Sequence, residues 1–409
     1  MNEKISLHKL NKNDFPQNWK LLPVGKVLKK TQYGSNESSD AKGNIRIVGM
    51  KNIIDGKVKT DNMSYVNLPE KEIQSFKLNK GDLLLNRTNS YDLVGKVGIY
   101  DLDLKCVFAS YLVRLECKKE IILPDYLNYW LNSYPTQKTL KRIATRAISQ
   151  ANINPTEFKK HCFVAVPPFE EQKKICLQLN NIDQVIDLTE RLINLKEVRR
   201  AVYLKSLMDM DQRIKGFNDS WNEYKLGELF TERRERNNTD LPLLSITMEK
   251  GVIPRHEVER IDISNEDKSK YLRICPGDIG YNTMRMWQGV SGLSTLEGIV
   301  SPAYTICTPN NIVDGKFMSY LFKLPRTIHM FYRYSQGLTS DTWNLKYHHF
   351  AQIKVSIPDK DEQIEIVKIL SLFDQEIKLL NEELELYKIQ KQGLKQKLLT
   401  GKWRVKVED

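Results

Sequence analysis

The chain has 409 residues and a net charge of +12, from 63 Lys and Arg against 51 Asp and Glu. At about 150 residues per domain, this length predicts two or three folded units. The content of 41% hydrophobic residues excludes a wholly disordered chain. The chain has no signal-peptide core and no run of about 18 apolar residues, so we expect a cytoplasmic protein without membrane spans.

The first half of the sequence predicts a β-rich domain followed by a long helix. Short β-rich runs at residues 94–100 and 109–115 are separated by Gly, Asn and Asp turns. A short helix is expected at about 126–132. Pro167 and Pro168, followed by two glutamates, then predict a helix start, because proline and carboxylates suit a first helical turn.

The second half repeats this plan, with a short helix expected at 317–324 and a helix start at Pro358. Five segments recur in the same order: 19–27 with 221–230, 78–88 with 274–283, 108–113 with 300–305, 125–131 with 316–322, and 166–172 with 357–363. A period of this length is too long for a solenoid repeat. We therefore interpret the chain as a duplicated domain, with a looser turn expected at Pro358-Asp359, where the first copy has two prolines.

The two predicted long helices share one heptad frame. The seam of the second helix is Ile366, Leu370, Phe373, Ile377, Leu380, Leu384, Tyr387, Lys391, Leu394 and Leu398. Subtracting the repeat offset of 191 gives the seam of the first: Ile175, Leu179, Ile182, Ile186, Thr189, Ile193, Lys196, Arg200, Tyr203 and Leu207. Such stripes are typical of coiled coils, so we expect the helices to pair. A helix of about 38 residues is about 57 Å long, so the pair would act as a spacer.

The sequence lacks the motifs of several enzyme classes. There is no G-x-x-x-x-G-K-[ST] loop for ATP, and no pair of Cys or His residues has the spacing of a metal site. The segment 166–169 is similar to a methyltransferase loop, but Val166 cannot hold the target amine and no Gly-rich loop accompanies it. We therefore expect no catalytic residues, no metal site and no bound cofactor in this chain.

The duplicated pattern resembles the specificity (S) subunits of type I restriction–modification enzymes. The resemblance covers nearly the whole chain and is carried by the Trp-x-x-x-x-x-Gly openings, the Gly-Asp pairs at 81–82 and 277–278, and the Pro-x-x-x-Glu-Gln helix starts. The ending Leu-Leu-Thr-Gly-Lys at 398–402 is also similar to the tail common in that family.

The resemblance implies an α+β fold: two similar mixed α/β target-recognition domains separated by a two-helix antiparallel coiled coil. The implied divisions are 1–165 and 211–356 for the two domains, 166–210 for the first spacer helix, and 357–409 for the second helix and tail. The implied function is recognition of a bipartite site in double-stranded DNA. Two methyltransferase (M) and two restriction (R) subunits would dock, and S-adenosylmethionine, ATP and Mg²⁺ would belong to these partners.

Candidate DNA-binding residues are those whose side chains pair with base edges or phosphates, in loops at matching places of both copies. In the first half they are Asn86, Arg87, Thr88, Asn89, Ser90 and Tyr91, with Lys141, Arg142, Arg146 and Gln150 as a second group. In the second half they are Asn282, Thr283, Arg285, Trp287 and Gln288, with Arg333, Ser335, Gln336 and Thr339. Arg233, Arg234 and Arg236 are expected to contact phosphates.

Two other interpretations stay open. The first is a duplicated DNA-binding or regulatory protein that acts alone, without enzyme partners. The second, a fused methyltransferase–nuclease, is disfavoured by the missing catalytic loops. The pI of about 9.1 fits a polyanionic partner in any of these cases.

Overall fold

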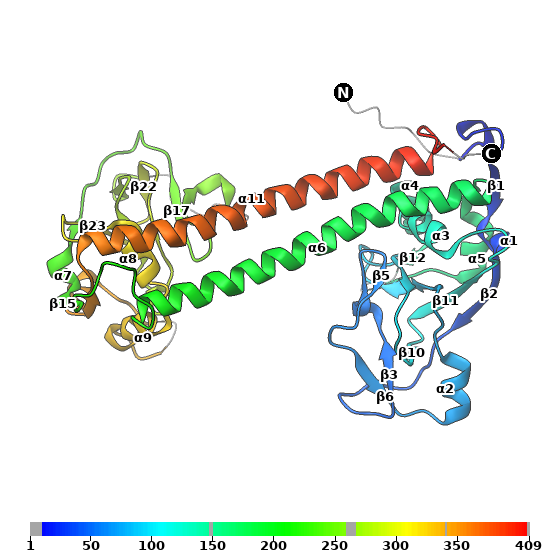
Figure 1. The fold of residues 1–409 in the computed structure, drawn as a ribbon, viewed down its shortest axis with the longest axis horizontal. Coiled ribbons are helices and arrows are strands. Elements are labelled where there is room, and N and C mark those ends of the chain that lie inside the picture. Colours follow the sequence, from blue (N-terminus) through cyan, green and yellow to red (C-terminus); the bar gives the residue numbers. More distant parts are fainter. Residues whose placement is uncertain (1–9, 147–149, 259–266, 340–341, 407–409) are drawn as a thin grey trace. The chain divides into compact units, whose positions relative to one another are not determined.

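The computed structural model describes residues 10–146, 150–258, 267–339 and 342–406. The chain forms two compact units: the first spans residues 1–190 and 383–409, and the second spans 191–382. Each unit contains one β-rich domain and part of each long helix, α6 (Phe169–Met208) and α11 (Lys360–Leu399) (Figure 1). The units therefore divide within the two helices.

The first domain is a mixed α/β structure. Its strands are β1 (Lys20–Pro23), β2 (Leu28–Tyr33), β3 (Ile45–Val48), β4 (Ile53–Ile54), β5 (Lys57–Val58), β6 (Ser64–Val66), β7 (Asp82–Asn86), β8 (Thr88–Asn89), β9 (Val97–Tyr100), β10 (Cys106–Phe108), β11 (Leu112–Cys117), β12 (Thr145–Arg146), β13 (Ala151–Asn152) and β14 (Phe163–Val166). Its helices are η1 (Lys12–Asp14), α1 (Val24–Val27), η2 (Met50–Asn52), α2 (Glu70–Phe76), α3 (Pro124–Leu131), α4 (Tyr134–Ile143) and α5 (Pro155–His161). The main sheet has the order β2-β11-β7-β9-β5-β4, beside the smaller sheets β10-β3-β6 and β12-β13-β8 and the ribbon β1-β14.

The second domain repeats the centre of this arrangement. Its strands are β15 (Asn222–Lys225), β16 (Phe230–Arg233), β17 (Leu244–Thr247), β18 (Gly251–Pro254), β19 (Leu272–Ile274), β20 (Ile279–Asn282), β21 (Ser291–Leu293), β22 (Gly298–Val300), β23 (Tyr304–Pro309) and β24 (Lys354–Ile357). Its helices are α7 (Leu226–Leu229), η3 (Arg255–Glu257), η4 (Met286–Gln288), α8 (Gly315–Leu321), α9 (Pro325–Tyr334) and α10 (Tyr347–Phe350). The order β16-β23-β20-β21 reproduces β2-β11-β7-β9, and β15-β24 reproduces β1-β14. The predicted duplication is confirmed.

Two expected strands begin later than the sequence pattern suggested. The run at 94–100 becomes a strand only at Val97, because Gly95 adopts a positive φ of 89° that ends the preceding turn. The run at 109–115 begins at Leu112, because the amide of Leu112 closes a turn on the carbonyl of Ala109 at 2.9 Å. In both cases β-prone residues lie in the turn that precedes the strand.

The Gly-Asp pairs hold the turn that leads into the central strand of each domain. Gly81 and Gly277 have positive φ values of 89° and 93°, a conformation that favours glycine. The carboxylate that follows accepts a hydrogen bond from the amide three residues earlier: Asn79 for Asp82, and Cys275 for Asp278, at 2.9 and 2.8 Å. Burial raises the pKa of Asp82. The motif thus fixes where each central strand starts.

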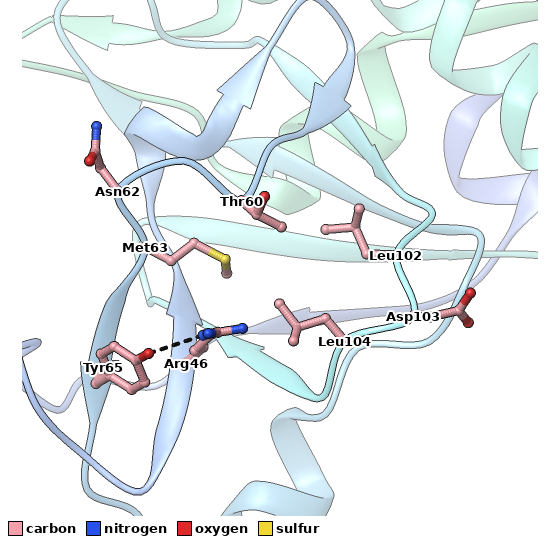
Figure 2. Close-up of a pocket in the computed structure, with 8 residues that line it drawn as sticks. All are labelled: Arg46, Thr60, Asn62, Met63, Tyr65, Leu102, Asp103 and Leu104. Carbon is pink, nitrogen blue, oxygen red and sulfur yellow. Dashed lines mark hydrogen bonds between the residues drawn. The ribbon is translucent and has the colours of Figure 1, made fainter.

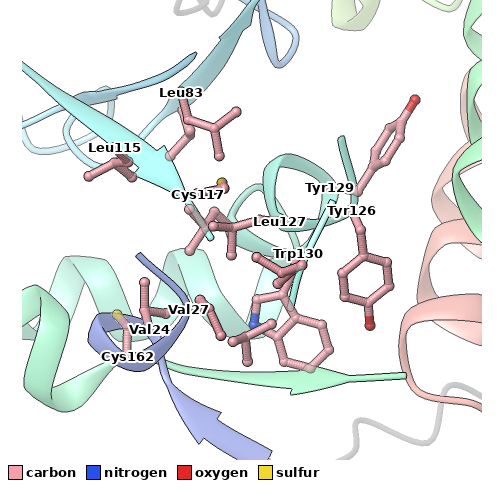
Figure 3. Packing of buried hydrophobic residues seen from close by; sticks show 14 of the residues in the cluster. Val24, Val27, Leu83, Leu115, Cys117, Tyr126, Leu127, Tyr129, Trp130 and Cys162 are labelled. Carbon is pink, nitrogen blue, oxygen red and sulfur yellow. The ribbon is translucent and has the colours of Figure 1, made fainter. Parts of the chain in front are cut away.

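A continuous apolar core joins the first sheet to the helices of its domain (Figure 3). Leu83 and Leu115 from neighbouring strands lie in one buried cluster with Tyr126 and Trp130 of α3. The Trp130 indole donates to the carbonyl of Phe163 at 2.8 Å, so its polar atom is satisfied within the core. This packing makes the first domain a rigid support for its surface loops.

The two long helices run antiparallel within each unit. In the first unit Asp183 pairs with Lys391 and Glu190 with Lys388. Residue numbers thus increase along one helix as they decrease along the other. In the second unit the pairs Lys196–Glu376 and Arg200–Asp374 show the same direction. None of the twenty predicted seam residues is exposed, and nine are buried: Ile175, Leu179, Ile186, Ile193, Leu207, Ile366, Leu370, Leu384 and Leu398. The predicted antiparallel coiled coil is confirmed.

The Glu-Gln pair after each helix start faces inward. The Gln172 amide donates to the carbonyls of Ile121 and Pro167, and Gln363 repeats this with Ile312 and Pro358. Since both turns are held by the same bonds, the expectation of a looser second turn was wrong. The preceding glutamate binds an arginine from beyond the end of the other long helix.

Each helix start is closed by a buried glutamate and an arginine. Arg404 donates to both carboxylate oxygens of Glu171 at 2.8 and 3.0 Å, and Arg213 does the same to Glu362 at 3.0 Å. We call these two pairs the charge clamps. Arg404 lies 191 residues after Arg213, so the clamps are another copy of the repeat.

Candidate nucleic-acid interface

In the first domain the small sheet β12-β13-β8 brings the two predicted groups of DNA-binding residues together. Its register sets Asn89 opposite Ala151, and Ala151 opposite Arg146. The amide of Ile153 also donates to the carbonyl of Arg87 at 2.8 Å. Segments about sixty residues apart therefore form one surface, which we call the first reading surface.

The side chains of this surface combine cations with aromatic rings. The Arg146 guanidinium lies 3.6 Å from the centroid of the Tyr91 ring, and the Lys141 ammonium lies 5.5 Å from the same centroid. Arg87 lies 4.8 Å from the centroid of Tyr33, an exposed residue that the sequence did not single out. Such cation–π contacts orient long basic side chains that would otherwise sample many rotamers.

The remaining first-half candidates differ in exposure. Asn86 and Thr88 are buried, and among the described residues Oδ1 of Asn86 has no hydrogen-bond partner. Ser90 is exposed, and its amide donates to Oδ1 of Asn89 at 2.8 Å. Arg142 and Gln150 are exposed, at the end of α4 and just before β13.

The second domain builds an equivalent surface at the end of β20. Thr283 joins it to the segment before α10, since its amide donates to Ala303 and its carbonyl accepts from Leu345 at 2.8 Å. Trp287, in η4, donates its indole N–H to the carbonyl of Met284 at 3.0 Å. Its ring also lies edge-on against Trp343, with centroids 5.0 Å apart. We call this the second reading surface.

The other second-half candidates surround it. Asn282 accepts from the amide of Met284, while Arg285 is exposed and Gln288 half-buried. Arg333 is exposed near the end of α9, the Ser335 hydroxyl donates to Phe331, Gln336 forms a bridge with Asn344, and the Thr339 amide donates to Thr342.

The three arginines expected at phosphates have different surroundings. Arg233 donates to the buried Asp278 at 2.8 Å and also pairs with Glu235. The Asp278 carboxylate raises the pKa of Arg233. Arg234 pairs with Glu232, and Arg236 is exposed. Arg233 thus ties β16 to the Gly-Asp turn, and phosphate contact by this group remains a prediction.

Sequence reasoning missed Tyr33, Tyr332 and Trp343. The centroid of Tyr332 lies 4.8 Å from that of Trp343, which completes an aromatic cluster with Trp287. The repeat could have identified Tyr332, because it lies 191 residues after the candidate Lys141. Nothing in the local sequence marks Tyr33 or Trp343, whose contacts come from distant segments.

A half-buried lysine, Lys323, holds the backbone beside the second reading surface by two hydrogen bonds. Lys323 donates to the carbonyl of Gly289 at 2.6 Å and to that of Met248 at 3.2 Å. Burial lowers the pKa of Lys323 to about 8. In the first domain the position 191 residues earlier is Asn132, which donates to the carbonyl of Val97 and accepts from the amide of the same residue.

An open pocket lies elsewhere on the first domain (Figure 2). It is lined by Arg46, Thr60, Asn62, Met63, Tyr65, Leu102, Asp103 and Leu104. Arg46 donates to the hydroxyl of Tyr65 at 3.2 Å, which engages one of the few polar groups that line the pocket. The pocket shares no residue with the first reading surface.

Two equivalent domains, each with a polar and aromatic surface at the end of its central strand, define a duplicated recognition protein. Residues 16–197 and 218–386 match the family described as the type I restriction modification DNA specificity domain. Since these matches cover most of the chain, it belongs to this family. None of the helices in the described part of the chain has the length and apolarity needed to cross a membrane.

Individual relatives and structures agree with this assignment. The chain is 25% identical to the Methanocaldococcus jannaschii protein described as the MjaX type I restriction enzyme specificity subunit, over 96% of this chain and 95% of the relative. It is 23% identical to the EcoBI specificity subunit of Escherichia coli over 44% of this chain and 38% of that one. The fold is similar to the S subunit structure from M. genitalium, with a TM-score of 0.60 at 17% identity, covering 95% of this chain and 97% of that one.

Proposed function

We propose that this chain is the DNA-reading subunit of a type I restriction–modification complex, with one half of a bipartite site read by each domain. The observation that carries the proposal is the pair of reading surfaces at equivalent places in two equivalent domains. Exposed Arg, Gln and Ser side chains there can pair with base edges and phosphates. The helices α6 and α11 would set the number of unread base pairs between the half-sites.

We further propose that M subunits bind an apolar stripe on the outer side of the long helices. In the first unit Leu188, Leu386 and Ile389 are 63%, 65% and 64% exposed. In the second unit Leu379, Leu195 and Val198 are 55%, 67% and 63% exposed. These residues are the same three positions of the repeat, and we call them the outer stripe.

The heptad frame explains why the outer stripe indicates a helical partner. With the seam at the a and d positions, Leu188, Leu195, Leu379 and Leu386 occupy c, which is solvent-facing in an isolated two-stranded coiled coil. Leucine at these positions leaves apolar area in water unless another amphipathic helix covers it. Because each unit carries one copy, the proposal includes two M subunits.

Catalysis, cofactors and restriction are assigned to the partners in this proposal. S-adenosylmethionine would bind the M subunits, and ATP and Mg²⁺ would bind two R subunits that join for cleavage. The alternative of a DNA-binding protein that acts alone makes the opposite prediction, that no M subunit copurifies with the chain.

Methylome sequencing tests the reading function. Cells that express the chain with its M subunit should carry methyladenine in one bipartite motif. Arg87→Ala should relax the base preference of one half of that motif, because Arg87 lies on the first reading surface alone. Equal relaxation of both halves would contradict the assignment of one domain to each half-site.

Copurification tests the partner surface. The double variant Leu195→Glu, Leu386→Glu should lose M subunits in size-exclusion chromatography, since charges would replace apolar contacts. Leu177→Glu is the matched control: Leu177 is 61% exposed on α6, but the repeat places Lys368 at the equivalent position. Retention of both M subunits by the double variant would contradict the docking site.

A further inference from the structure

The net charge is distributed very unevenly between the two domains. Residues 1–165 contain 27 Lys and Arg against 16 Asp and Glu, whereas residues 211–356 contain 19 against 17. The excess of +11 in the first domain therefore accounts for nearly all of the total of +12. Two domains that read equivalent half-sites thus present very different electrostatic potentials to a phosphate backbone.

Two arginines of the second domain are also held by its own carboxylates. Arg273 pairs with Glu235 and Glu297, and Arg233 pairs with Glu235 and Asp278. A guanidinium held between two carboxylates attracts a phosphate weakly, because the neighbouring negative charges offset its own. These two arginines are accordingly less available to phosphates.

The same contrast appears at matched positions of the two reading surfaces. Helices α4 and α9 have equal length and start 191 residues apart, which aligns Lys141 with Tyr332. Counting from the Gly-Asp turns aligns Tyr91 with Trp287. In the first domain cations lie against the Tyr91 ring. In the second domain the equivalent ring of Trp287 packs against Trp343, which in turn packs against Tyr332.

The second reading surface also exposes apolar side chains. Tyr332 is 43% exposed and Leu338 is 100% exposed. Leu338 lies in the loop closed by the Gln336–Asn344 bridge, next to the aromatic cluster in sequence. A fully exposed leucine in such a loop does not stabilise the isolated fold. It can, however, contact thymine methyl groups or sugar faces in a DNA groove.

We propose that the two domains hold DNA by different chemistry. The first domain neutralises phosphates and supplies the salt-dependent share of the affinity. The second supplies a largely salt-independent apolar contact through Trp287, Tyr332, Leu338 and Trp343. This inference rests on the proposed function, because it assumes that both surfaces face DNA. It predicts that the complex first engages DNA of any sequence through the first domain, where counterion release is largest.

The test is the salt dependence of DNA binding by the full complex of this chain with its M subunit. Fluorescence anisotropy would give Kd for a duplex carrying the bipartite methylation motif and for a scrambled duplex, between 50 and about 300 mM KCl. The double variant Lys141→Ala, Arg146→Ala should lower the slope of log Kd against log salt concentration by up to about 2, from two lost phosphate contacts of about 0.9 each.

The position-matched variant Tyr332→Ala should weaken binding to the motif duplex about tenfold at every salt concentration, without a change of slope. Leu338→Ser should act in the same direction, and because this side chain is fully exposed the variant leaves the fold intact. An unchanged slope in the lysine–arginine variant, or a lowered slope in Tyr332→Ala and Leu338→Ser, would overturn the inference. A wild-type complex that binds the motif and scrambled duplexes equally would instead overturn the proposed function.

Discussion

The two units of this molecule are alike where the long helices contact the domains and different at the reading surfaces. In each unit a tyrosine from a short domain helix, an aspartate of one long helix and a cation of the other form one network. Tyr129 donates to Asp183 at 2.6 Å and Lys391 pairs with the same carboxylate. Tyr320 donates to Asp374 at 2.5 Å and Arg200 pairs with it. The equivalent reading surfaces, by contrast, replace a lysine by a tyrosine.

This difference indicates which contacts both halves require. The tyrosine–aspartate–cation networks and the charge clamps fix the helices against the domains, so a change in one copy would misplace its whole domain. In the proposed function, a reading surface affects only the DNA that its own domain contacts, which leaves it free to differ. The comparison can be tested by changing matched residues in the two units and measuring the difference between the two variants.

The largest difference is expected between the two charge clamps. Arg213→Ala should reduce the free energy of unfolding by about 3 kcal/mol, because it leaves the buried Glu362 carboxylate without its guanidinium partner. Arg404→Ala should cost about half as much, because Glu171 keeps the hydrogen bond from the Trp19 indole at 3.0 Å. Urea-induced unfolding of the two variants measures both values. Equal losses would show that the clamps are energetically equivalent despite this extra bond.

The tyrosine–aspartate–cation networks should instead behave alike. Asp183→Ala and Asp374→Ala should each lower the free energy of unfolding by about 2 kcal/mol, since each removes the acceptor of a buried tyrosine and the counter-charge of a seam cation. Double-mutant cycles with Lys391→Ala and Arg200→Ala isolate the ion pairs. A coupling energy present in one unit and absent from the other would break the proposed equivalence.

The smallest effect concerns Lys323, which has the uncharged Asn132 as its counterpart. Because burial lowers the folded-state pKa of Lys323 to about 8, the unfolded chain binds this proton more tightly. Stability should therefore rise with pH across the window from about 8 to about 10.4, the pKa of an unperturbed lysine. The wild type should gain about 1 kcal/mol relative to Lys323→Met between pH 7.5 and 9 in thermal unfolding. A constant difference between the two proteins over this range would contradict the shift.

Much of the candidate site could be predicted from local sequence. The runs after the two Gly-Asp turns do reach the reading surfaces, because the turn and strand that position them are encoded by adjacent residues. The second groups of candidates, at 141–146 and 333–339, lie on the same two surfaces. Tyr33 and Trp343 could not be predicted, since each becomes part of a surface only when a strand or loop from elsewhere in the chain packs beside it.

The sequence by itself determined the duplication, the heptad frame of the two helices and the family, because each is written as a pattern of residue types at fixed spacing. Tertiary structure alone decided which cations are available and which are engaged. The sequence offers Arg233 and Arg87 alike as DNA-contact candidates, yet Arg233 binds the buried Asp278 while Arg87 lies against the exposed Tyr33 ring. The role of a charge depends on partners within a few ångströms, and folding selects those partners from distant parts of the chain.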